Sequence, residues 1–467
     1  MENRNPAAGA APRENKMGIL PVGKLLAGMA VPMMISMLFQ ALYNIVDSVF
    51  VAKISQDALN AVSLAFPLQS LMIAVGAGTG VGMNALLSRS LGEKKQDVAD
   101  RTANTGIALF LLSGIVFAII GLLVSRPFFQ VITENQTIID YGATYTTICL
   151  GLSIGIFSQF CFERLLQSTG RTTISMCTQL LGAIINMILD PILIFGLFGL
   201  PRMEVAGAAV ATVGGQIIAA MVAVIANLKL NPDIHIRLND ILHPKAEIAK
   251  EIYRVGIPSI IMQSIGSVMT FGLNRILISF TEAATAVFGA YFKLQSFIFM
   301  PIFGLNNGMV PIVAYNYGAA RMDRVKKTIK LTIIAAMSIM FLGFLAFQFL
   351  PVQLLGLFTP SEEMLAVGPV ALRTISYSFL LAGFCIIAGS VCQAIGNPMY
   401  SLIVSVCRQL VVLLPAAWLL AQTGNLDLVW LSFPIAELMS LALSTVFLRR
   451  TLRAADQYTQ RLQQEEN

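Results

Sequence analysis

Two aspartates lie in stretches of the sequence that are otherwise largely apolar. Asp47 lies within the first long hydrophobic run, and Asp190 lies in the segment 186–196, NMILDPILIFG, with Pro191 directly after it. An ionisable group inside a membrane span costs roughly 2.5–3.5 kcal/mol on insertion scales, so it indicates a functional site by default. Carboxylate oxygens of this kind could hold a Na⁺ ion or exchange a proton.

Other oxygen-bearing side chains accompany both aspartates. Asn44 precedes Asp47 by three residues, and Asn186 precedes Asp190 by four, so on a helix each asparagine shares a face with its aspartate. At the helical rise of 1.5 Å per residue both carboxylates would lie about 9–14 Å below the outer surface, with Thr212 at a similar depth. The sequence therefore predicts one polar site made of two carboxylates, two amides and a hydroxyl.

The proline beside Asp190 adds a backbone group to this site. Pro191 has no N–H, so it cannot donate to the carbonyl of Met187 four residues earlier. A free carbonyl oxygen is tolerated in a membrane only where it faces protein, water or an ion. Pro191 is thus either a hinge beside the site or an ordinary kink.

The composition places these sites in a membrane protein. The chain has 467 residues, of which 56% are hydrophobic and 12% charged, whereas soluble domains carry about 25% charged residues. The six cysteines lie in apolar runs and both histidines lie in one polar loop, so we expect no zinc site and no catalytic cluster, and the chain is not expected to be an enzyme. The twelve predicted spans are 24–53, 57–87, 102–125, 137–162, 171–197, 204–228, 251–277, 283–314, 328–350, 365–391, 398–421 and 428–449.

The basic residues predict the orientation. With the N-terminus inside the cell, most of the 31 lysines and arginines fall on the cytoplasmic side, and only Lys53, Arg126 and Arg202 lie outside. Both termini are therefore expected in the cytoplasm and the protein in the inner cell membrane. The basic stretches 89–101 and 321–330 are expected to be interfacial helices. The net charge of +6 follows from this asymmetry and from attraction to membrane lipid, and requires no nucleic acid.

The two halves of the chain resemble one another at a single offset. Pro32 pairs with Pro258, a shift of 226, and the same shift pairs Gly82-Met83 with Gly308-Met309. Each half would hold six spans, an even number, so the halves should be related by an axis along the membrane normal. The sequence predicts an all-α polytopic membrane protein of two six-helix lobes, with these parts: an N-terminal tail 1–23, an N-lobe 24–228, a loop 229–250, a C-lobe 251–449 and a C-terminal tail 450–467.

The repeat copies the prolines and glycines but neither aspartate. The shift places Asp47 opposite Leu273 and Asp190 opposite Ala416. Glycines such as Gly78, four residues before Gly82, predict close helix packing in the copied scaffold. The architecture is duplicated, whereas the acidic site belongs to the N-lobe alone.

Two further acidic residues are secondary candidates. Glu437 lies in the last span, where Lys293, Arg373 and Arg408 are available as ion-pair partners, so a functional and a structural role both stay open. Glu163 is adjacent to Arg164 near the cytoplasmic end of a span. We expect these two neighbours to form an interfacial pair.

Several segments resemble the multidrug and toxic compound extrusion (MATE) family over nearly the whole chain. They are LYNIVDSVFVAKISQDALNAVSLAFPLQ at 42–69, NMILDPILIFG at 186–196, GAAVATVGGQ at 207–216, GLNNGMVPIVAYNYGAAR at 304–321 and CQAIGNPM at 392–399. The resemblance implies twelve helices in two lobes and export of organic cations driven by inward H⁺ or Na⁺.

The resemblance also implies roles for particular residues. Asp47 matches the family's first-helix aspartate, and Asn186, Asp190 and Thr212 match its N-lobe polar cluster. Pro32 matches a first-helix proline linked to bending, and Tyr145 matches a fourth-helix tyrosine. The chain departs from some Na⁺-coupled members, because its seventh helix has no glutamate and its tenth no aspartate.

These observations lead to one hypothesis and its alternatives. The chain is expected to be a secondary active exporter of small amphiphilic, cationic compounds, monomeric and without a cofactor, that antiports substrate against H⁺ or Na⁺. Asp47 and Asp190 would bind the coupling ion. The main alternative is a lipid-linked precursor flippase or metabolite exporter of the same broad superfamily. An intramembrane enzyme would need a nucleophile or metal set within a span, and a channel would not need two lobes.

Overall fold

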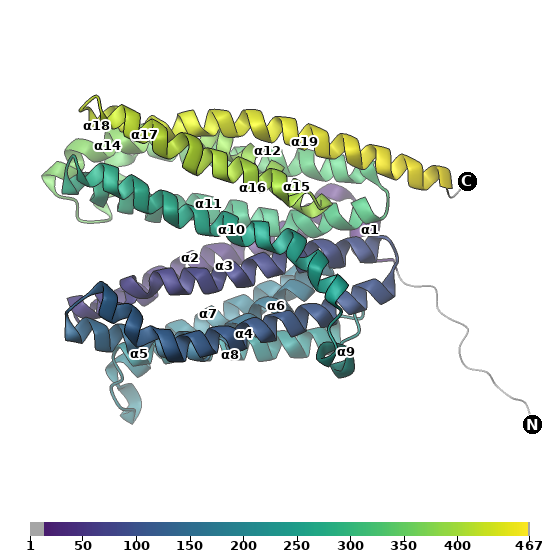
Figure 1. The fold of residues 1–467 in the computed structure, drawn as a ribbon, viewed down its shortest axis with the longest axis horizontal. Helices are drawn as coiled ribbons and strands as arrows, with labels where there is room; N and C mark the ends of the chain where they lie inside the picture. Colours follow the sequence, from purple (N-terminus) through teal and green to yellow (C-terminus); the bar gives the residue numbers. More distant parts are fainter. Residues whose placement is uncertain (1–13, 466–467) are drawn as a thin grey trace, which may run out of the picture.

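The computed structural model describes residues 14–465, which form helices joined by short turns and no β-strand. Figure 1 shows the helices running side by side along one axis, with the first half of the chain below and the second half above. The helices of the first half are α1 (Lys16–Ile19), α2 (Val22–Ala52), α3 (Gln56–Gly92), α4 (Gln96–Ile132), α5 (Gln136–Gly151), α6 (Ile154–Ser168), α7 (Thr172–Phe195), η1 (Leu197–Gly199), α8 (Val205–Leu230) and α9 (Leu238–Leu242).

The second half repeats this arrangement with more interruptions. Its helices are α10 (Ala246–Ile278), α11 (Glu282–Gly318), α12 (Met322–Phe349), α13 (Pro351–Gly356), α14 (Glu362–Ser376), α15 (Phe379–Ile395), α16 (Pro398–Val406), the π-helix η2 (Cys407–Leu413), α17 (Leu414–Ala421), α18 (Leu426–Val429) and α19 (Ser432–Glu465).

Twelve spans are present if each bent pair of helices counts as one. Ten helical stretches among the described residues are long and apolar enough to cross a membrane alone, which confirms a polytopic all-α protein. The spans expected at 137–162 and 365–391 are bent, by 44° between α5 and α6 and by 48° between α14 and α15. At the first bend the Ser153 hydroxyl donates to the carbonyl of Gly114 on α4.

The expectation of interfacial helices at 89–101 and 321–330 is wrong. Helix α3 continues to Gly92 and α4 begins at Gln96, so the first basic stretch consists of the ends of two long helices and their turn. The second stretch has the same form, because α11 ends at Gly318 and α12 begins at Met322. The basic residues therefore extend the spans beyond the apolar region.

The two halves meet through repeat-related glycines. A Cβ on Gly82 of α3 would overlap the carbonyl oxygen of Ile252 on α10, and a Cβ on Gly308 of α11 would lie 2.5 Å from Ala30 Cα on α2. These helices therefore touch backbone to backbone, as small residues allow in membranes, which confirms the packing expected from the glycine spacing. The contacts lie toward the end of the molecule that carries α1 and the last turns of α19 (Figure 1).

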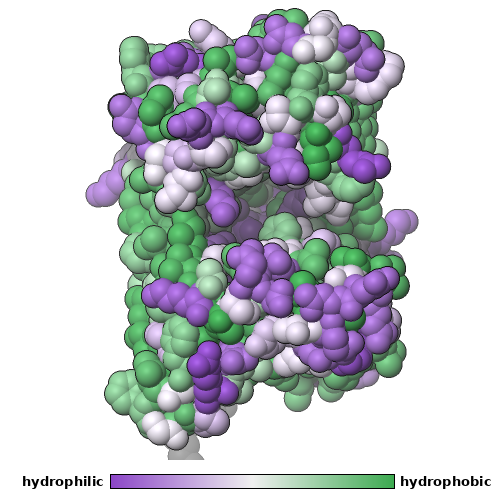
Figure 2. All heavy atoms as spheres, turned by 90° about the vertical axis from the view of Figure 1, so that its left-hand side faces the viewer, coloured by the Kyte–Doolittle hydropathy of each residue, from purple (hydrophilic) through white to green (hydrophobic). Residues whose placement is uncertain are grey.

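The opposite end of the molecule is open. Figure 2 shows a hollow between the two halves at that end, with hydrophilic side chains on its rim and hydrophobic side chains on the flanks. The hydrophobic flanks are the surface that would face lipid. The structure therefore shows one closed end and one open end, and the boundaries of the lobes and tails given above remain predictions.

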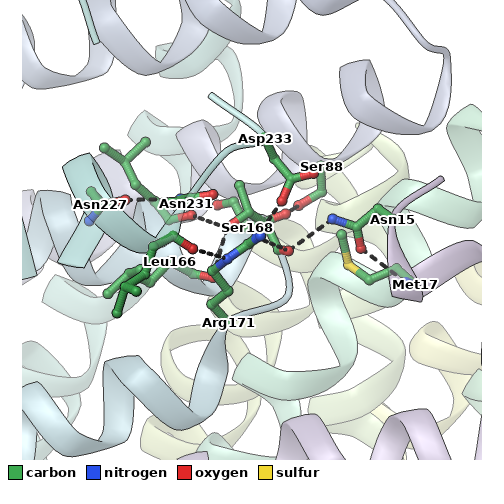
Figure 3. Close-up of polar contacts among 12 residues, drawn as sticks. Asn15, Met17, Ser88, Leu166, Ser168, Arg171, Asn227, Asn231 and Asp233 are labelled. Atoms are coloured by element: carbon green, nitrogen blue, oxygen red, sulfur yellow. Dashed lines mark hydrogen bonds and ion pairs between the residues drawn. The ribbon is translucent and has the colours of Figure 1, made fainter. Parts of the chain in front are cut away.

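The closed end is tied together by the segment that precedes α2. The Asn15 amide donates to the carbonyl of Thr169 in the first half at 3.0 Å. The carbonyl of Met17 accepts from Asn316 at 3.1 Å and from Arg324 at 3.0 Å, both in the second half. Figure 3 shows Asn15 and Met17 beside the polar network that surrounds Ser168 and Arg171. The segment that leads into the first span therefore contacts both halves.

Candidate functional site

Asp190 is held at the centre of a hydrogen-bonded group inside the first half. Its side chain on α7 is 0% exposed. The Asn186 amide, one turn earlier, lies 3.0 Å from the Thr212 hydroxyl on α8. When the amide nitrogen donates to Asp190 Oδ2 at 3.0 Å, the amide oxygen accepts from the hydroxyl and the backbone N–H of Thr212, each at 3.0 Å. We assign this orientation because it gives every one of these groups a partner.

Asp47 reaches the same place from α2. Its carboxyl group lies next to that of Asp190, and Tyr43, one turn earlier, lies near Thr212. One oxygen of each carboxyl group, Oδ1 of Asp47 and Oδ1 of Asp190, is buried without a hydrogen-bond partner in the described part of the chain. Two carboxylates this close repel one another when both are ionised, so the pair favours a bound proton or cation between them.

A second layer of polar groups borders the pair. Tyr145 on α5 is buried, and its hydroxyl accepts from the Gln69 amide of α3 at 3.2 Å. The thiol of Cys149, one turn along from Tyr145, lies close enough to interact with the charge of Asp47. The structure thus brings Asp47, Asp190, Asn186, Thr212 and Tyr145 into one half, around a shared centre.

Sequence reasoning missed three members of this group. Tyr43 lies one helical turn before Asp47, Cys149 lies one turn after Tyr145, and Gln69 belongs to the segment repeated at 292–296. The first two could have been found by extending the i, i+4 argument from the residues already chosen. Gln69 had no such signal, because only the packing of α3 against α5 places it here.

Asn44 does not join the group. Asn44 is exposed. Its backbone carbonyl accepts a hydrogen bond from the Ser48 hydroxyl at 2.9 Å. Three residues correspond to 300° of helical rotation, so Asn44 lies about 60° around the helix from Asp47. That angle is enough to turn its amide away from the buried centre.

The two proposed hinge prolines lie inside continuous helices. Pro32 lies within α2 and Pro191 within α7, and neither helix ends at its proline. Helix α7 ends instead at Phe195 and is capped by Gly196, which has a left-handed backbone conformation with φ of 72°. The hinge role of both prolines remains a prediction.

Glu163 occupies a second buried polar site near the closed end. It is 3% exposed and accepts from the amides of Gln159 and Gln179 at 2.9 Å each. The expected pair with Arg164 is wrong, because adjacent residues on a helix point about 100° apart. Arg164 instead donates to Asn307 of α11 at 3.1 Å and so joins the two halves.

The buried acid of the second half has a basic partner. Glu437 on α19 is 5% exposed, and its Oε2 lies 3.5 Å from the guanidinium of Arg408, one of the three partners considered from the sequence. Arg408 belongs to the π-helix η2, a distortion frequent at functional sites. Oε1 of Glu437 and the hydroxyl of Ser440 are buried without partners among the described residues.

The fold and the site together define a class of protein. Two halves built on one repeat, closed at one end and open at the other, with two neighbouring carboxylates inside the first half, form the architecture of a membrane transporter. A model of the MatE family matches residues 32–192 and again residues 258–419. The chain belongs to the MatE family. The two matches begin at 32 and 258, which is the same shift of 226 found within the sequence.

Known proteins resemble the chain over nearly its whole length. A FAD transporter of Shewanella oneidensis is 25% identical over 91% of this chain and 94% of its own. The multidrug export protein MepA of Staphylococcus aureus is 28% identical over 89% of this chain and 91% of its own. A solved structure described as the outward-facing conformation of a multidrug resistance MATE family transporter covers 96% of this chain and 100% of its own, with 25% identity and a TM-score of 0.90. The chain is therefore a multi-pass membrane transporter and not an enzyme.

Proposed function

We propose that the protein exports small amphiphilic organic cations and couples their export to the entry of H⁺ or Na⁺ at Asp47 and Asp190. The observation that carries this proposal is the pairing of the two carboxyl groups, each with a buried oxygen that lacks a partner in the described chain. Such a pair binds one positive charge in preference to none, because the cation relieves the repulsion between the carboxylates.

The open end supplies a route for the ion. Figure 2 shows the hollow between the halves, and the similar solved structure was described as outward-facing. An ion that enters from outside carries its charge through the membrane field, worth roughly 2.3 kcal/mol per 100 mV. Ion and substrate need not share atoms, since each need only prefer a different conformation of the protein.

The side chains present are compatible with either ion. For Na⁺ the donor set would be the carboxylates of Asp47 and Asp190 with the hydroxyl of Thr212, all hard oxygen ligands. For H⁺ the carboxyl groups would share one proton. Asn186 holds Asp190 in place in both cases through its amide nitrogen.

A metabolite exporter is the second candidate, because a relative is a FAD transporter. A flavin nucleotide carries negative phosphates, so this substrate would need cations in the spans. The basic residues in or near the spans of the second half are Arg275, Lys293, Arg373 and Arg408. The multidrug relative MepA favours organic cations instead.

We propose further that the protein lies in the inner membrane, as a monomer, with both termini in the cytoplasm.

Transport in proteoliposomes tests both the function and the ion. Ethidium movement is measured under an imposed Na⁺ gradient and, separately, under a proton gradient. Movement under one gradient, lost in Asp47→Asn, is the expected result. The matched control is Asp140→Asn, which removes a carboxylate from a surface pair with Arg126 and should transport normally. No movement under either gradient with folded protein, or full activity in Asp47→Asn, would refute the proposal.

A further inference from the structure

A second polar cavity lies at the closed end of the molecule. Its volume is about 300 Å³, at the lower limit for small-molecule sites. The walls are formed by α3, α10, α11 and α19 and by the turn between α15 and α16. Figure 1 shows α19 extending past its neighbours at this end. Neither Asp47 nor Asp190 borders this cavity, so the ion-coupling proposal leaves it unexplained.

Two arginines line the cavity and differ in how firmly they are held. Arg254 is mostly exposed, and its guanidinium lies 3.7 Å from Glu251, a loose contact. Arg89 donates to Glu93 at 2.7 Å, and its guanidinium lies over the rings of Tyr317 and Tyr458 at 5.1 and 5.8 Å. The aromatic rings therefore fix Arg89 in position, while Arg254 is free to turn toward a ligand.

The surrounding charges leave a small positive excess. Burial raises the pKa of Glu93, but hydrogen bonds from Lys95 and Arg89 outweigh it, so the pKa lies below its ordinary value and Glu93 is ionised. The cavity lining carries two cations, Arg89 and Arg254, against one anion, Glu251. Glu93 lies outside the lining and pairs with both Arg89 and Lys95. A ligand with one negative charge would balance the set.

Neutral donors complete the lining. Tyr317, Tyr458 and Asn397 border the cavity, and the side chain of Asn397 makes no capping hydrogen bond to α16. Guanidinium groups beside hydroxyl and amide donors match the oxygens of a phosphate group. A carboxylate would leave several of these donors unused.

We infer that this cavity binds a phosphate group, with the phosphodiester of an anionic phospholipid as its source at the membrane surface. The position supports a lipid, because the cavity lies at the basic ends of the spans, where pockets between helices bind anionic headgroups. A free phosphate compound has the same chemistry and is distinguished below.

The cavity exists only while the closed end stays closed. Arg89 comes from α3 of the first half, whereas Arg254 and both tyrosines come from the second half. A phosphate held between them joins the halves, so by mass action it stabilises the form that is open at the other end. This conformational effect rests on the proposed alternating access, whereas phosphate binding itself does not.

Lipid retention tests the binding. The full-length protein is taken from vesicles of equal phosphatidylglycerol and phosphatidylcholine, and bound lipids are counted by native mass spectrometry. Wild type should retain phosphatidylglycerol at least about fivefold over phosphatidylcholine, as charge-assisted hydrogen bonds predict. Arg254→Ala should lose this preference. Arg101→Ala removes the same charge at the same end, from a surface pair with Asp97, and should keep it. The proposal would be refuted if Arg254→Ala retained phosphatidylglycerol as well as wild type does. It would also be refuted if Arg101→Ala lost the preference to the same extent as Arg254→Ala.

A second variant guards against misfolding of the first. Asn397 is the N-cap residue of α16, a position where aspartate is well tolerated. Asn397→Asp places a negative charge in the cavity and should also lose the preference for phosphatidylglycerol. Unchanged retention in this variant would refute the proposal.

Two further measurements identify the source of the phosphate group and the effect of its binding on conformation. If inorganic phosphate raises the unfolding temperature of wild type but not of Arg254→Ala, the ligand is a soluble phosphate compound; if only phosphatidylglycerol does so, it is lipid. Stabilisation by neither would refute the site.

Spin labels at the repeat-related positions 97 and 323, in a cysteine-free background, report whether the end that carries the cavity is closed. Phosphatidylglycerol should enlarge the population closed at that end at least about twofold. Retained lipid without this shift would leave the phosphate site standing and refute its conformational role, independently of the ethidium assay.

Discussion

The interiors of the two halves differ far more than their scaffolds. In the first half Asp190 lies beside Asp47, so two acids of the same charge are neighbours. In the second half Glu437 faces Arg408, so the buried charge is already balanced by protein. Under the proposed coupling, only the first of these interiors would take up a cation from solution, because the second already contains one.

The scaffolds agree even in unusual backbone positions. Lys94 and Ala320 are left-handed at φ of 57° and 55°, and Gly170 and Gly396 at φ of 86° and 95°, each pair separated by 226 residues. Left-handed backbone is uncommon outside glycine, so these matches show that the duplicated halves kept their turns. The proposed difference in function between the halves would therefore depend on the side chains that this shared frame carries.

Aromatic rings fill much of the interior of the second half. Phe288 lies against Phe292 at 4.7 Å between ring centroids, and Phe347 lies against Phe379 at 5.1 Å. Leu273, which is related to Asp47 by the repeat, is fully buried. Such packing leaves little room for an ion and its ligands.

The largest effect should come from removing one acid of each half. Asp190→Asn should reduce ion-driven ethidium transport by at least about tenfold, because the neutral amide no longer attracts a cation. Glu437→Gln, the matched change in the other half, should retain most of the transport. Both variants should be folded by size-exclusion chromatography. Equal loss in both would show that the halves share the coupling role.

Breaking the ion pair of the second half should affect stability before transport. Arg408→Met leaves Glu437 buried without its partner and should destabilise by roughly 2–3 kcal/mol, below the 3–5 kcal/mol of a fully buried pair because Arg408 is partly exposed. The double variant Arg408→Met/Glu437→Leu should recover most of this loss in thermal unfolding. A double variant as unstable as the single one would contradict a purely structural pair.

The glycine contacts between the halves should be sensitive to one added carbon. Gly308→Ala places a Cβ 2.5 Å from Ala30 Cα, and such overpacking costs about 1–3 kcal/mol. Gly289→Ala on the same helix has no atom within 4 Å and should be neutral or slightly stabilising. Unfolding temperatures of the two variants in one detergent provide the measurement. Similar temperatures would mean that the halves do not meet as described.

The smallest effect should come from the border of the acidic site. Tyr145→Phe removes the hydroxyl that accepts from Gln69, a loss of about 0.5–1.5 kcal/mol. Transport should fall modestly, and Tyr141→Phe, whose hydroxyl donates to Glu204 nearer the open end, should not reduce it. Complete inactivity of Tyr145→Phe would place this hydroxyl among the ion ligands.

Much of the fold followed from the sequence because its signals are local. Hydrophobic runs, basic turns and a constant shift of 226 predicted the twelve spans and the twofold design, and Gly82 predicted a close helix contact. The bends after Gly151 and Ser376 were not predicted, since hydropathy reports length and not direction. The start of α4 at Gln96 was missed. The polar end of a helix that extends out of the membrane has the same sequence pattern as a separate surface helix.

The sequence by itself determined that Asp47 and Asp190 lie in spans at similar depth, because depth follows from helical rise and position in the chain. Only the tertiary structure decided which partners they have. It turned Asn44 away, brought in Tyr43 and Gln69, and paired Glu437 with Arg408 among three candidates. Those choices depend on how α2, α3, α7 and α19 rotate and pack, and contacts between distant segments leave no periodic pattern in a single chain.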